Sequence, residues 1–449
     1  MQHKINWENA VNSTVSNLSS LIQLDTTNPP GNELPAVQLI RDILLENGIP
    51  EDAINLIDCG SNRGNLVARL RGDGSARPLM LTGHVDVVPV EREFWSRDPF
   101  GGEVAEGCVW GRGALDMKGI VASYLQAFIL AHQQKLPLKR DLIFAAIADE
   151  EMTFEYGSRY LVNHHPDWID AEYALCEDGG KTRHLFGMRI YHIQVAEKGV
   201  CWLNARMSGT PGHASMPHED NAVFHLVDAL EKLRKKKYLP FHITTMARQT
   251  LDTLARNSKF PKSLAYSILR YPLFTRFVLE RLPEKDKQSI LAMISNTISP
   301  TVLKAGSKTN VIPSQAEAHI DCRTLPGFTP QDAMDEILDI TGPGLELEPL
   351  DTSVGPQVPI DAKLYQVMEK SLRKMDPEGV IIPFMSPGAS DAVEYSKGGI
   401  KVYGFSPGIV PDGFPFVDLI HGHDERIPIE TIRTGLPALW EVVSEFCCT

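Results

Sequence analysis

The sequence predicts an α/β protein with a mostly parallel sheet, helices on both of its faces, and an inserted smaller α+β domain. Strand-like apolar runs alternate with helical stretches through the first two hundred of the 449 residues. Near Gly199 this pattern changes to a turn-rich segment followed by an amphipathic helix, and α/β character returns after about residue 350. The first domain is therefore predicted to be discontinuous, over residues 1–197 and 351–449, with the second domain at 198–350.

The elements of the first domain follow from short apolar runs and from helical periodicity. Runs of buried-strand length alternate with stretches whose apolar residues recur at helical spacing. The predicted strands are Leu79–Val90, Leu142–Ala148, Glu172–Cys176 and Ile400–Phe405, and the predicted helices are Ile120–His132 and Leu364–Lys374.

The second domain is predicted from a strand at Val200–Met207 and a helix in which Ala222, Val223, Leu226, Val227, Leu230 and Leu233 form an apolar stripe. The basic end of that helix, 232–237, complements a helix dipole better than it indicates nucleic-acid binding. A partly apolar helical insertion is expected near 260–300. A strand at Glu317–Cys322 and a helix near Pro330–Ile340 complete the domain.

Composition excludes several classes of function. The net charge of −13, from 44 Lys and Arg against 57 Asp and Glu, argues against a nucleic-acid partner. No apolar run approaches the roughly 18 residues that a membrane span needs, so no membrane partner is expected. The N-terminus carries no targeting signal, and the seven cysteines include no C-x-x-C pair, so we expect a cytoplasmic protein with reduced thiols.

Histidine and carboxylate residues stand where predicted strands leave the sheet. His84 and Asp86 lie late in the first strand, and Asp116 follows a glycine-containing loop. Glu150 and Glu151 end the second strand, and Glu177 ends the third. Ligand crevices of open α/β sheets lie at the carboxyl ends of strands, so these side chains are expected to converge there. A set of oxygen and imidazole donors without thiolate suits zinc, manganese or cobalt.

Each of these residues also has a simpler interpretation. Asp116 taken alone is more often a helix N-cap, the Glu150-Glu151 pair a solvated loop, and His84 a hydrogen-bonded core or rim histidine. The joint pattern favours the metal site. The spacing of His84 and Asp86 turns both side chains the same way, which lets a carboxylate accept the second N–H of a metal-bound imidazole.

The chain resembles the M20 metallopeptidases, the group of aminoacylase-1, carboxypeptidase S, acetylornithine deacetylase and succinyl-diaminopimelate desuccinylase. The matching stretches stand in family order. They are Thr82–Pro89, Gly111–Gly119, Asp149–Glu151, Ala174–Glu177, Gly209–Ser215 and His421–Arg426. The resemblance implies a di-zinc exopeptidase-type sheet with a smaller lid and dimerisation domain, and the long helical segment before Asn310 looks most like the carboxypeptidase S and aminoacylase branch.

The resemblance also implies two zinc ions per subunit, with cobalt or manganese as possible replacements. Asp116 would bridge them, His84 and Glu177 would complete one site, and Glu151 and His421 the other. Glu150 would be the general base, and Asp86 the carboxylate that orients His84. Glu177 is preferred to Asp178 as a ligand because the Ala-Leu-x-Glu match has no gap. His421 is preferred to His423 because it stands four residues before Glu425; contact of Asp178 or His423 with metal stays open.

Substrate-binding roles come from the same resemblance. His213 would stabilise the oxyanion in the partner subunit, which implies a homodimer. Asn310 and Arg323 would contact the substrate, with Arg323 binding its carboxylate. Gly388 and Ser390 belong to the Gly388-Ala389-Ser390-Asp391 loop, which would line the same pocket.

Three rival interpretations were weighed. Gly404–Gly408 fits the G-x-S-x-G pattern of serine hydrolases, but Pro407 has no N–H to donate to an oxyanion. Gly111-Arg112-Gly113 begins like a dinucleotide-binding loop, yet Asp116 takes the place of the third glycine. A catalytically silent dimeric binding protein would lack a ligand or the base, and none is missing.

The sequence thus predicts a metal-dependent hydrolase that cleaves an amide bond of a small peptide or an N-acyl amino acid. A carboxypeptidase-like or aminoacylase-like enzyme is the first expectation. A deacylase of the acetylornithine deacetylase and desuccinylase type is the alternative.

Overall fold

The computed structural model describes residues 5–449, with only the backbone described for Lys285. The chain divides into two compact units. Unit 1 contains Met1–Val195, Val358–Phe384 and Ser390–Thr449, and unit 2 contains Ala196–Gln357 and Met385–Ala389. The short segment Met385–Ala389 belongs to unit 2, although the sequence assigned everything after residue 350 to the first domain.

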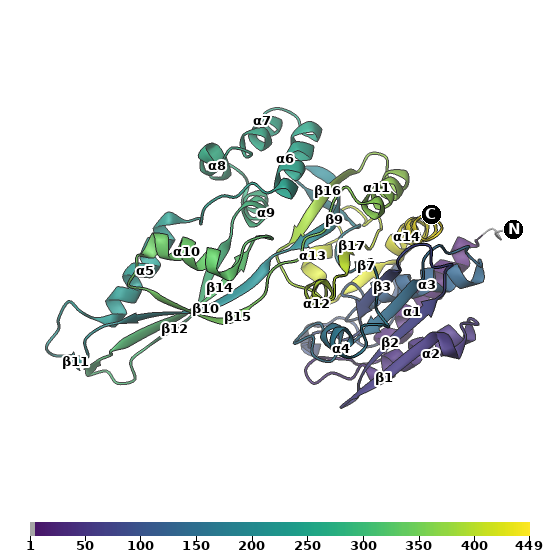
Figure 1. The fold of residues 1–449 in the computed structure, drawn as a ribbon, viewed down its shortest axis with the longest axis horizontal. Coiled ribbons are helices and arrows are strands. Elements are labelled where there is room, and N and C mark those ends of the chain that lie inside the picture. The colour runs from purple at the N-terminus through teal and green to yellow at the C-terminus, as the bar shows by residue number, and fades with distance from the viewer. Residues whose placement is uncertain (1–4) are drawn as a thin grey trace. The chain divides into compact units, whose positions relative to one another are not determined.

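Unit 1 is built on a nine-stranded sheet in the order β1-β2-β6-β3-β7-β17-β9-β16, with β8 paired to β9 (Figure 1). The four central strands, β6, β3, β7 and β17, run parallel, whereas β1, β2, β8 and β9 pair antiparallel. The strands are β1 (Ile54–Gly60), β2 (Arg63–Leu70), β3 (Leu79–His84), β6 (Leu142–Ile147), β7 (Tyr173–Cys176), β8 (Thr182–Leu185), β9 (Met188–Glu197), β16 (Val380–Ser386) and β17 (Lys401–Gly404). The expected α/β class with a parallel centre is confirmed, and the antiparallel strands lie outside that centre.

Helices flank this sheet. Helix α3 packs on β3 and β6, and it also contacts α1 and α14, while α2 covers β1 and β2. A core of apolar side chains from β3, β6 and β7 packs against α4 and α12. The helices are α1 (Trp7–Ile22), α2 (Leu34–Glu46), α3 (Lys118–Gln133), α4 (Ser158–His164), α11 (Lys363–Met375), α12 (Ala392–Lys397), α13 (Phe416–Leu419) and α14 (Ile429–Cys447).

A small three-stranded sheet and two short 3-10 helices complete unit 1. The sheet has the order β18-β5-β4, from β4 (Val104–Ala105), β5 (Cys108–Trp110) and β18 (Arg426–Pro428), and the 3-10 helices span Glu51–Ala53 and Arg92–Phe94. This sheet pairs the segment after Asp424 with the strand that precedes Gly111. It therefore joins two of the loops in which the sequence located site residues.

Two sequence-based boundaries were wrong in a way that matters for the site. The strand predicted at Leu79–Val90 ends at His84, so Asp86 lies in the following loop. Helix α3 begins at Lys118, and its N-cap residue is Met117, which makes no side-chain capping hydrogen bond. Asp116 therefore does not cap the helix, and the simpler interpretation of this residue is excluded.

Unit 2 is an antiparallel four-stranded sheet in the order β12-β14-β10-β15, with α5 and α10 packed on it (Figure 1). Strand β14 alternates buried and partly exposed residues, because one face of the sheet packs on the helices. The elements are β10 (Gly199–Ser208), β12 (Thr297–Ala305), β14 (Gln315–Thr324), β15 (Glu346–Thr352), α5 (Ala222–Lys236) and α10 (Pro330–Thr341).

Two further features belong to unit 2. Two short strands that are distant in sequence, β11 (Gly212–His213) and β13 (Val311–Ile312), pair antiparallel as a separate two-stranded sheet, the β11 tip. Three helices lie in the segment near 260–300 where the sequence indicated a helical insertion: α7 (Lys262–Ile268), α8 (Pro272–Leu279) and α9 (Glu284–Ile294). A further helix, α6 (Thr245–Asn257), precedes them.

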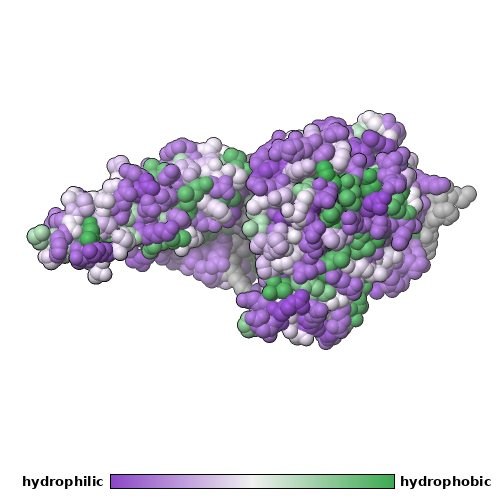
Figure 2. All heavy atoms as spheres, turned by 90° about the horizontal axis from the view of Figure 1, so that it is seen from below, coloured by the Kyte–Doolittle hydropathy of each residue, from purple (hydrophilic) through white to green (hydrophobic). Residues whose placement is uncertain are grey.

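The surface is predominantly polar. Hydrophilic residues cover most of the face drawn in Figure 2, and apolar residues form smaller patches between them. Among the described residues, no helix has both the length and the apolar character needed to cross a bilayer.

Candidate metal centre

One strand end and four loops of unit 1 carry the histidine and carboxylate residues to one edge of the sheet. His84 is the last residue of β3, Glu150 and Glu151 follow β6, and Glu177 follows β7. These three strands are parallel neighbours in the order β6-β3-β7, so their carboxyl ends share one edge. The loop before α3 adds Asp116, and the loop before β18 adds His421.

The carboxylate of Asp116 lies between the two histidines. Its Oδ1 is 3.3 Å from Nε2 of His84, and its Oδ2 is 3.2 Å from Nε2 of His421. The His84 ring also faces Glu177 Oε2 at 3.7 Å, and the His421 ring faces Glu151 Oε1 at 3.2 Å. One carboxylate with an oxygen directed to each of two imidazoles is the arrangement that a bridging ligand of two cations requires.

These side chains form three overlapping groups, each with ligand atoms within 4.8 Å of one another. The groups are His84, Asp116 and Glu177; His84, Glu150 and Glu151; and Asp116, Glu151 and His421. His84 is fully buried, whereas the side chain of His421 is 49% exposed, so the cluster opens to solvent on the His421 side. Glu150 and Glu151 are largely buried, which does not fit a solvated loop.

Burial, together with the charges of neighbouring groups, shifts the pKa values of this cluster. Burial, followed by the charge of Glu177, raises the pKa of Glu150 well above its ordinary value. Burial likewise raises the pKa of Glu177 to about 7. Burial lowers the pKa of His84, but its contacts with Asp116, Asp86 and Glu177 outweigh that effect and raise it well above normal. Hydrogen bonding to Asp116 and Glu151 raises the pKa of His421 to about 10.

This donor set fits divalent cations. Oε1 of Glu177 is buried and has no hydrogen-bond partner among the described residues, although a buried carboxylate oxygen ordinarily requires one. Positive charge placed among the acids would stabilise their ionised forms. Carboxylate and imidazole donors without thiolate suit zinc, manganese or cobalt.

Asp86 holds the loop that carries Glu150 and Glu151. Its Oδ1 and Oδ2 accept hydrogen bonds from the backbone N–H groups of Glu150 and Glu151, at 3.2 and 3.1 Å. The Nδ1 of His84 lies 3.0 Å from the main-chain oxygen of Asp86 and 3.5 Å from its Oδ1. The main-chain oxygen is thus the nearer partner of the imidazole, and the carboxylate mainly holds the glutamate loop.

Sequence reasoning missed the residues that fix this carboxylate. Asn28 donates to Asp86 at 2.9 Å and to Asp149 at 3.0 Å. Asp149 is also bound by Arg63, which in turn pairs with Glu33 at 2.7 Å. Asn28, Arg63 and Glu33 are buried and lie far from the motifs in the sequence, so only a search for buried polar partners would have found them. Asp149 belongs to the Asp149–Glu151 stretch, but its partners could not be read from it.

Glu425 holds the loop that delivers Asp116. Its carboxylate accepts from Arg112 Nη1 at 2.6 Å and from the backbone N–H groups of Gly113, Leu115 and Asp116, at 3.1, 2.7 and 3.2 Å. The glycine-containing loop that resembles a dinucleotide motif therefore already binds an anion, the side chain of Glu425. From the sequence alone, Glu425 was only the reference position that favoured His421 over His423 as a ligand.

Asp178 and His423 lie outside the three groups. The backbone of Asp178 has a φ of 59°, and its Oδ1 lies 3.0 Å from both Arg183 Nη2 and His192 Nε2. His423 lies 3.0 Å from Glu91 and stacks on Phe94 at a centroid separation of 5.1 Å. Both residues are engaged by neighbours other than the candidate ligands.

The remaining predicted site residues belong mostly to unit 2. His213, on the β11 tip, is exposed, with Nδ1 2.7 Å from Ser215 Oγ, and Asn310 precedes the paired strand β13. Arg323, on β14, donates from Nε and Nη2 to Asp321 at 2.7 and 3.1 Å.

The predicted glycine-rich loop is divided between the units. Gly388 lies in the segment of unit 2, and Ser390 begins the last segment of unit 1. The buried Ser390 Oγ accepts from the backbone N–H of Ala392 at the start of α12, at 3.2 Å. The adjacent Asp391 is fully buried, and neither carboxylate oxygen has a hydrogen-bond partner among the described residues.

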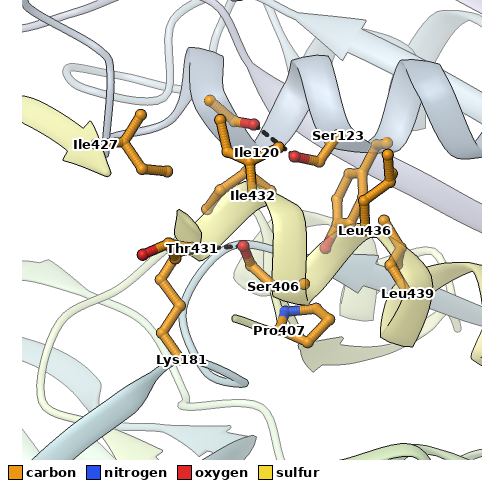
Figure 3. Close-up of a pocket in the computed structure, with 13 residues that line it drawn as sticks. Ile120, Ser123, Lys181, Ser406, Pro407, Ile427, Thr431, Ile432, Leu436 and Leu439 are labelled. Carbon is orange, nitrogen blue, oxygen red and sulfur yellow. Dashed lines mark hydrogen bonds between the residues drawn. The ribbon is translucent and has the colours of Figure 1, made fainter. Parts of the chain in front are cut away.

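The serine of the G-x-S-x-G pattern is not exposed as a nucleophile. Lys181 Nζ donates to Ser406 Oγ at 2.5 Å, and both side chains border a cavity of about 20 Å³ between α3 and α14 (Figure 3). Such a volume holds about one water molecule and no substrate. Pro407 lies beside the serine in this view and supplies no N–H.

Comparison with known proteins agrees with this geometry. The sequence profile of Peptidase family M20/M25/M40 matches residues 80–445, a span that contains all the candidate ligands. The chain belongs to this family. As an M20 protein it is a hydrolase of a family of metallopeptidases and related amidohydrolases.

Two curated relatives of this M20 protein have names that differ in the substrate they indicate. It is 28% identical over 388 residues to the N-fatty-acyl-amino acid synthase/hydrolase PM20D1 of Mus musculus, covering 83% of this chain and 74% of that protein. It is 26% identical over 384 residues to the probable carboxypeptidase S-like 2 of Dictyostelium discoideum, covering 82% of this chain and 72% of that protein.

The fold is shared with a solved M20 structure. The M20 family metallo-carboxypeptidase Sso-CP2 of Sulfolobus solfataricus superposes with a TM-score of 0.68 over 97% of this chain and 99% of that chain, at 16% sequence identity.

Proposed function

We propose that this M20 protein binds two zinc ions and hydrolyses the amide bond next to a free carboxylate, in an N-acyl amino acid or at the carboxyl terminus of a peptide. The observation that carries the proposal is the position of Asp116, with one oxygen toward His84 and the other toward His421. We propose His84 and Glu177 as the further ligands of one ion, and Glu151 and His421 as those of the other. Bound zinc ions would lower the pKa of a water molecule and polarise the scissile carbonyl.

Glu150 is the proposed general base. Its Oε2 lies 3.8 Å from His84 Nε2, and its backbone N–H is held by Asp86. In this position it accepts a proton from the attacking water and returns the proton to the leaving amine. Asp86 fixes both the base and the neighbouring ligand Glu151 through their main-chain N–H groups.

Residues of unit 2 are proposed to complete the site in a homodimer. His213 would stabilise the oxyanion in the partner subunit, and Asn310 and Gly388 would contact the substrate. Arg323 would bind the substrate carboxylate, and because Asp321 already accepts two of its hydrogen bonds, the substrate would share the guanidinium. The seven cysteines form no disulfide in the described part of the chain, which is compatible with the proposed cytoplasmic location.

Both names among the relatives support the substrate class. An N-fatty-acyl amino acid and a peptide each present an amide bond beside a carboxylate, the feature that the proposed use of Arg323 requires. A panel of N-acyl amino acids, from short to long acyl chains, and of dipeptides therefore tests the choice between them. The alternative is a dimeric binding protein without catalysis.

Replacing the base tests the proposal. In Glu150→Gln the two zinc ions should remain, while turnover falls by about 10²- to 10⁴-fold, because ligands persist and proton transfer does not. Metal content by mass spectrometry and hydrolysis of the panel measure the two effects separately. Glu155→Gln, an exposed change on the same loop, is the matched control and should keep its activity.

Full activity in Glu150→Gln would refute the role of Glu150. Two equivalents of metal in the unchanged protein, with no turnover on the whole panel, would instead favour the binding protein.

A further inference from the structure

Large apolar side chains are exposed together on the helical insertion of unit 2. Six of them lie within residues 260–277, and the most exposed are Leu273 at 86% and Phe260 at 79%. The others are Leu264, Tyr271, Phe274 and Phe277. Scattered single apolar residues are ordinary on a protein surface, whereas so many in one short segment favour an interaction surface.

The segment is a folded part of the unit. Tyr266, Leu269, Thr275 and Leu279 are fully buried, so α7 and α8 are anchored by one set of side chains while another set points outward. In α8, Leu273 and Phe277 are one helical turn apart and share the outer face, whereas Thr275 and Leu279 face inward. The helices that carry the exposed apolar side chains therefore also have a buried face of their own.

The same segment is strongly basic in an acidic protein. Residues 259–281 contain five basic residues against one acidic residue, Glu280, although the whole chain has a net charge of −13. The basic residues are Lys259, Lys262, Arg270, Arg276 and Arg281. The Arg281 guanidinium lies 3.5 Å from the centroid of the Phe277 ring, so charge and apolar surface adjoin.

The combination of exposed apolar side chains with basic residues favours one class of binding partner. A second copy of the chain would bring the same basic residues to a two-fold contact, and like charges would oppose each other. An anionic lipid surface offers negative headgroups to the basic residues and an acyl boundary to the aromatic and aliphatic ones. The sequence argument against a membrane partner rested on the lack of a spanning run, and a surface contact requires no span.

We propose that the α7–α8 segment, residues 259–281, docks the protein on anionic lipid surfaces. The apolar side chains enter the headgroup region, and the basic side chains bind lipid phosphates and carboxylates. Arg270 and Arg276 also pair with Asp252 and Glu280, at 2.6 and 3.3 Å, so they share their charge with these acids. The contact uses none of the candidate metal ligands and does not depend on the proposed function.

Vesicle flotation with the full chain tests this proposal. The protein should float with phosphatidylcholine vesicles that contain phosphatidylserine, and far less with vesicles of phosphatidylcholine alone. Added salt should weaken the binding, because it screens the basic residues. The double variant Leu273→Ser with Phe277→Ser should lose at least about tenfold in binding, because two apolar side chains no longer enter the lipid.

Two controls separate the surface from general stability. Leu303→Ser removes an apolar side chain on β12 that is 65% exposed, and it should bind vesicles as the unchanged protein does. All variants should keep the same thermal unfolding midpoint and the same hydrolysis of a water-soluble substrate. Lys259→Gln with Lys262→Gln should weaken binding only to the phosphatidylserine vesicles.

Three results would overturn the proposal. One is the absence of flotation with anionic vesicles, and another is equal binding to neutral vesicles. The third is a double variant that floats normally but loses a concentration-dependent dimer in light scattering, which would assign the surface to a second copy.

Discussion

The buried pair of Glu425 and Arg112 allows a quantitative prediction. Glu425→Gln keeps the shape of the side chain but turns one carboxylate oxygen into an NH₂ donor. If this NH₂ takes the place of Oε1, it faces the N–H groups of Leu115 and Asp116. If it takes the place of Oε2, it faces Arg112 and the N–H of Gly113. Either orientation leaves two buried donors without an acceptor.

The magnitude follows from these contacts. Each buried unsatisfied donor costs about 1 to 3 kcal/mol, and a buried charge that loses its partner costs about 3 to 5 kcal/mol. Glu425 and Arg112 are 0% and 2% exposed, so solvent does not relieve the loss. We expect Glu425→Gln to reduce the free energy of unfolding by about 3 to 5 kcal/mol, and metal affinity to fall because the loop carries Asp116.

Urea unfolding followed by tryptophan fluorescence, together with metal content, measures both effects. Glu430→Gln is the matched control, because its carboxylate is 59% exposed and pairs with Arg433 at the surface at 3.3 Å. The control should lose less than about 1 kcal/mol. If Glu425→Gln unfolds within about 1 kcal/mol of the control and keeps its metal, the buried pair does not stabilise the site.

Three further predictions concern the site and unit 2. Asp86→Asn should lower metal affinity by about 10- to 100-fold, measured by competition with a chelator, because one of the two acceptors for the Glu150 and Glu151 N–H groups becomes a donor; unchanged affinity would count against this positioning role. His213→Ala should reduce turnover more than metal content, and a strictly monomeric, active protein in light scattering would refute its partner-subunit role. Burial lowers the pKa of Lys198 from 10.5 to about 7, so the folded state carries the full cost of protonation below pH 7 and sheds it as the pH rises toward 10.5. The unchanged protein should therefore gain about 2 kcal/mol of stability relative to Lys198→Met between pH 7 and pH 9, and equal slopes in urea unfolding would contradict this.

The sequence predicts a strand best where its residues are buried without interruption or where a turn marks its end. β6 and β10 lie within one residue of the predicted strands, because every residue of β6 is buried and β10 is bounded by a clear turn. The strand predicted at Leu79–Val90 is too long. Val85 and Val87 are buried in a loop, and their apolar side chains give the same sequence pattern as a buried strand. Apolar composition reports burial and does not distinguish a buried loop from a strand.

The residues of the candidate site also differ in how well the sequence predicts them. Residues in local motifs could be named: His84 and Glu151 stand at or just after the end of a predicted strand, and Asp116 follows a glycine-containing loop. Contacts between distant segments could not be named: Asn28 reaches Asp86 across 58 positions, and Glu425 reaches Arg112 across 313. Nothing in a single sequence records such pairs. The predicted pocket residue Ser390 accepts a hydrogen bond from the backbone N–H of Ala392, a contact that its neighbours in sequence do not reveal.

The insertion of unit 2 within the sequence of unit 1 sets the order in which a ribosome can produce a complete metal centre. His84, Asp116, Glu150, Glu151 and Glu177 leave the exit tunnel early, whereas His421 and the supporting Glu425 follow more than two hundred residues later. Strand β17, which pairs with β7 in the middle of the sheet, is equally late. The proposed ligand set is therefore incomplete throughout the synthesis of unit 2, and the proposed two-ion site can be completed only when translation is nearly finished.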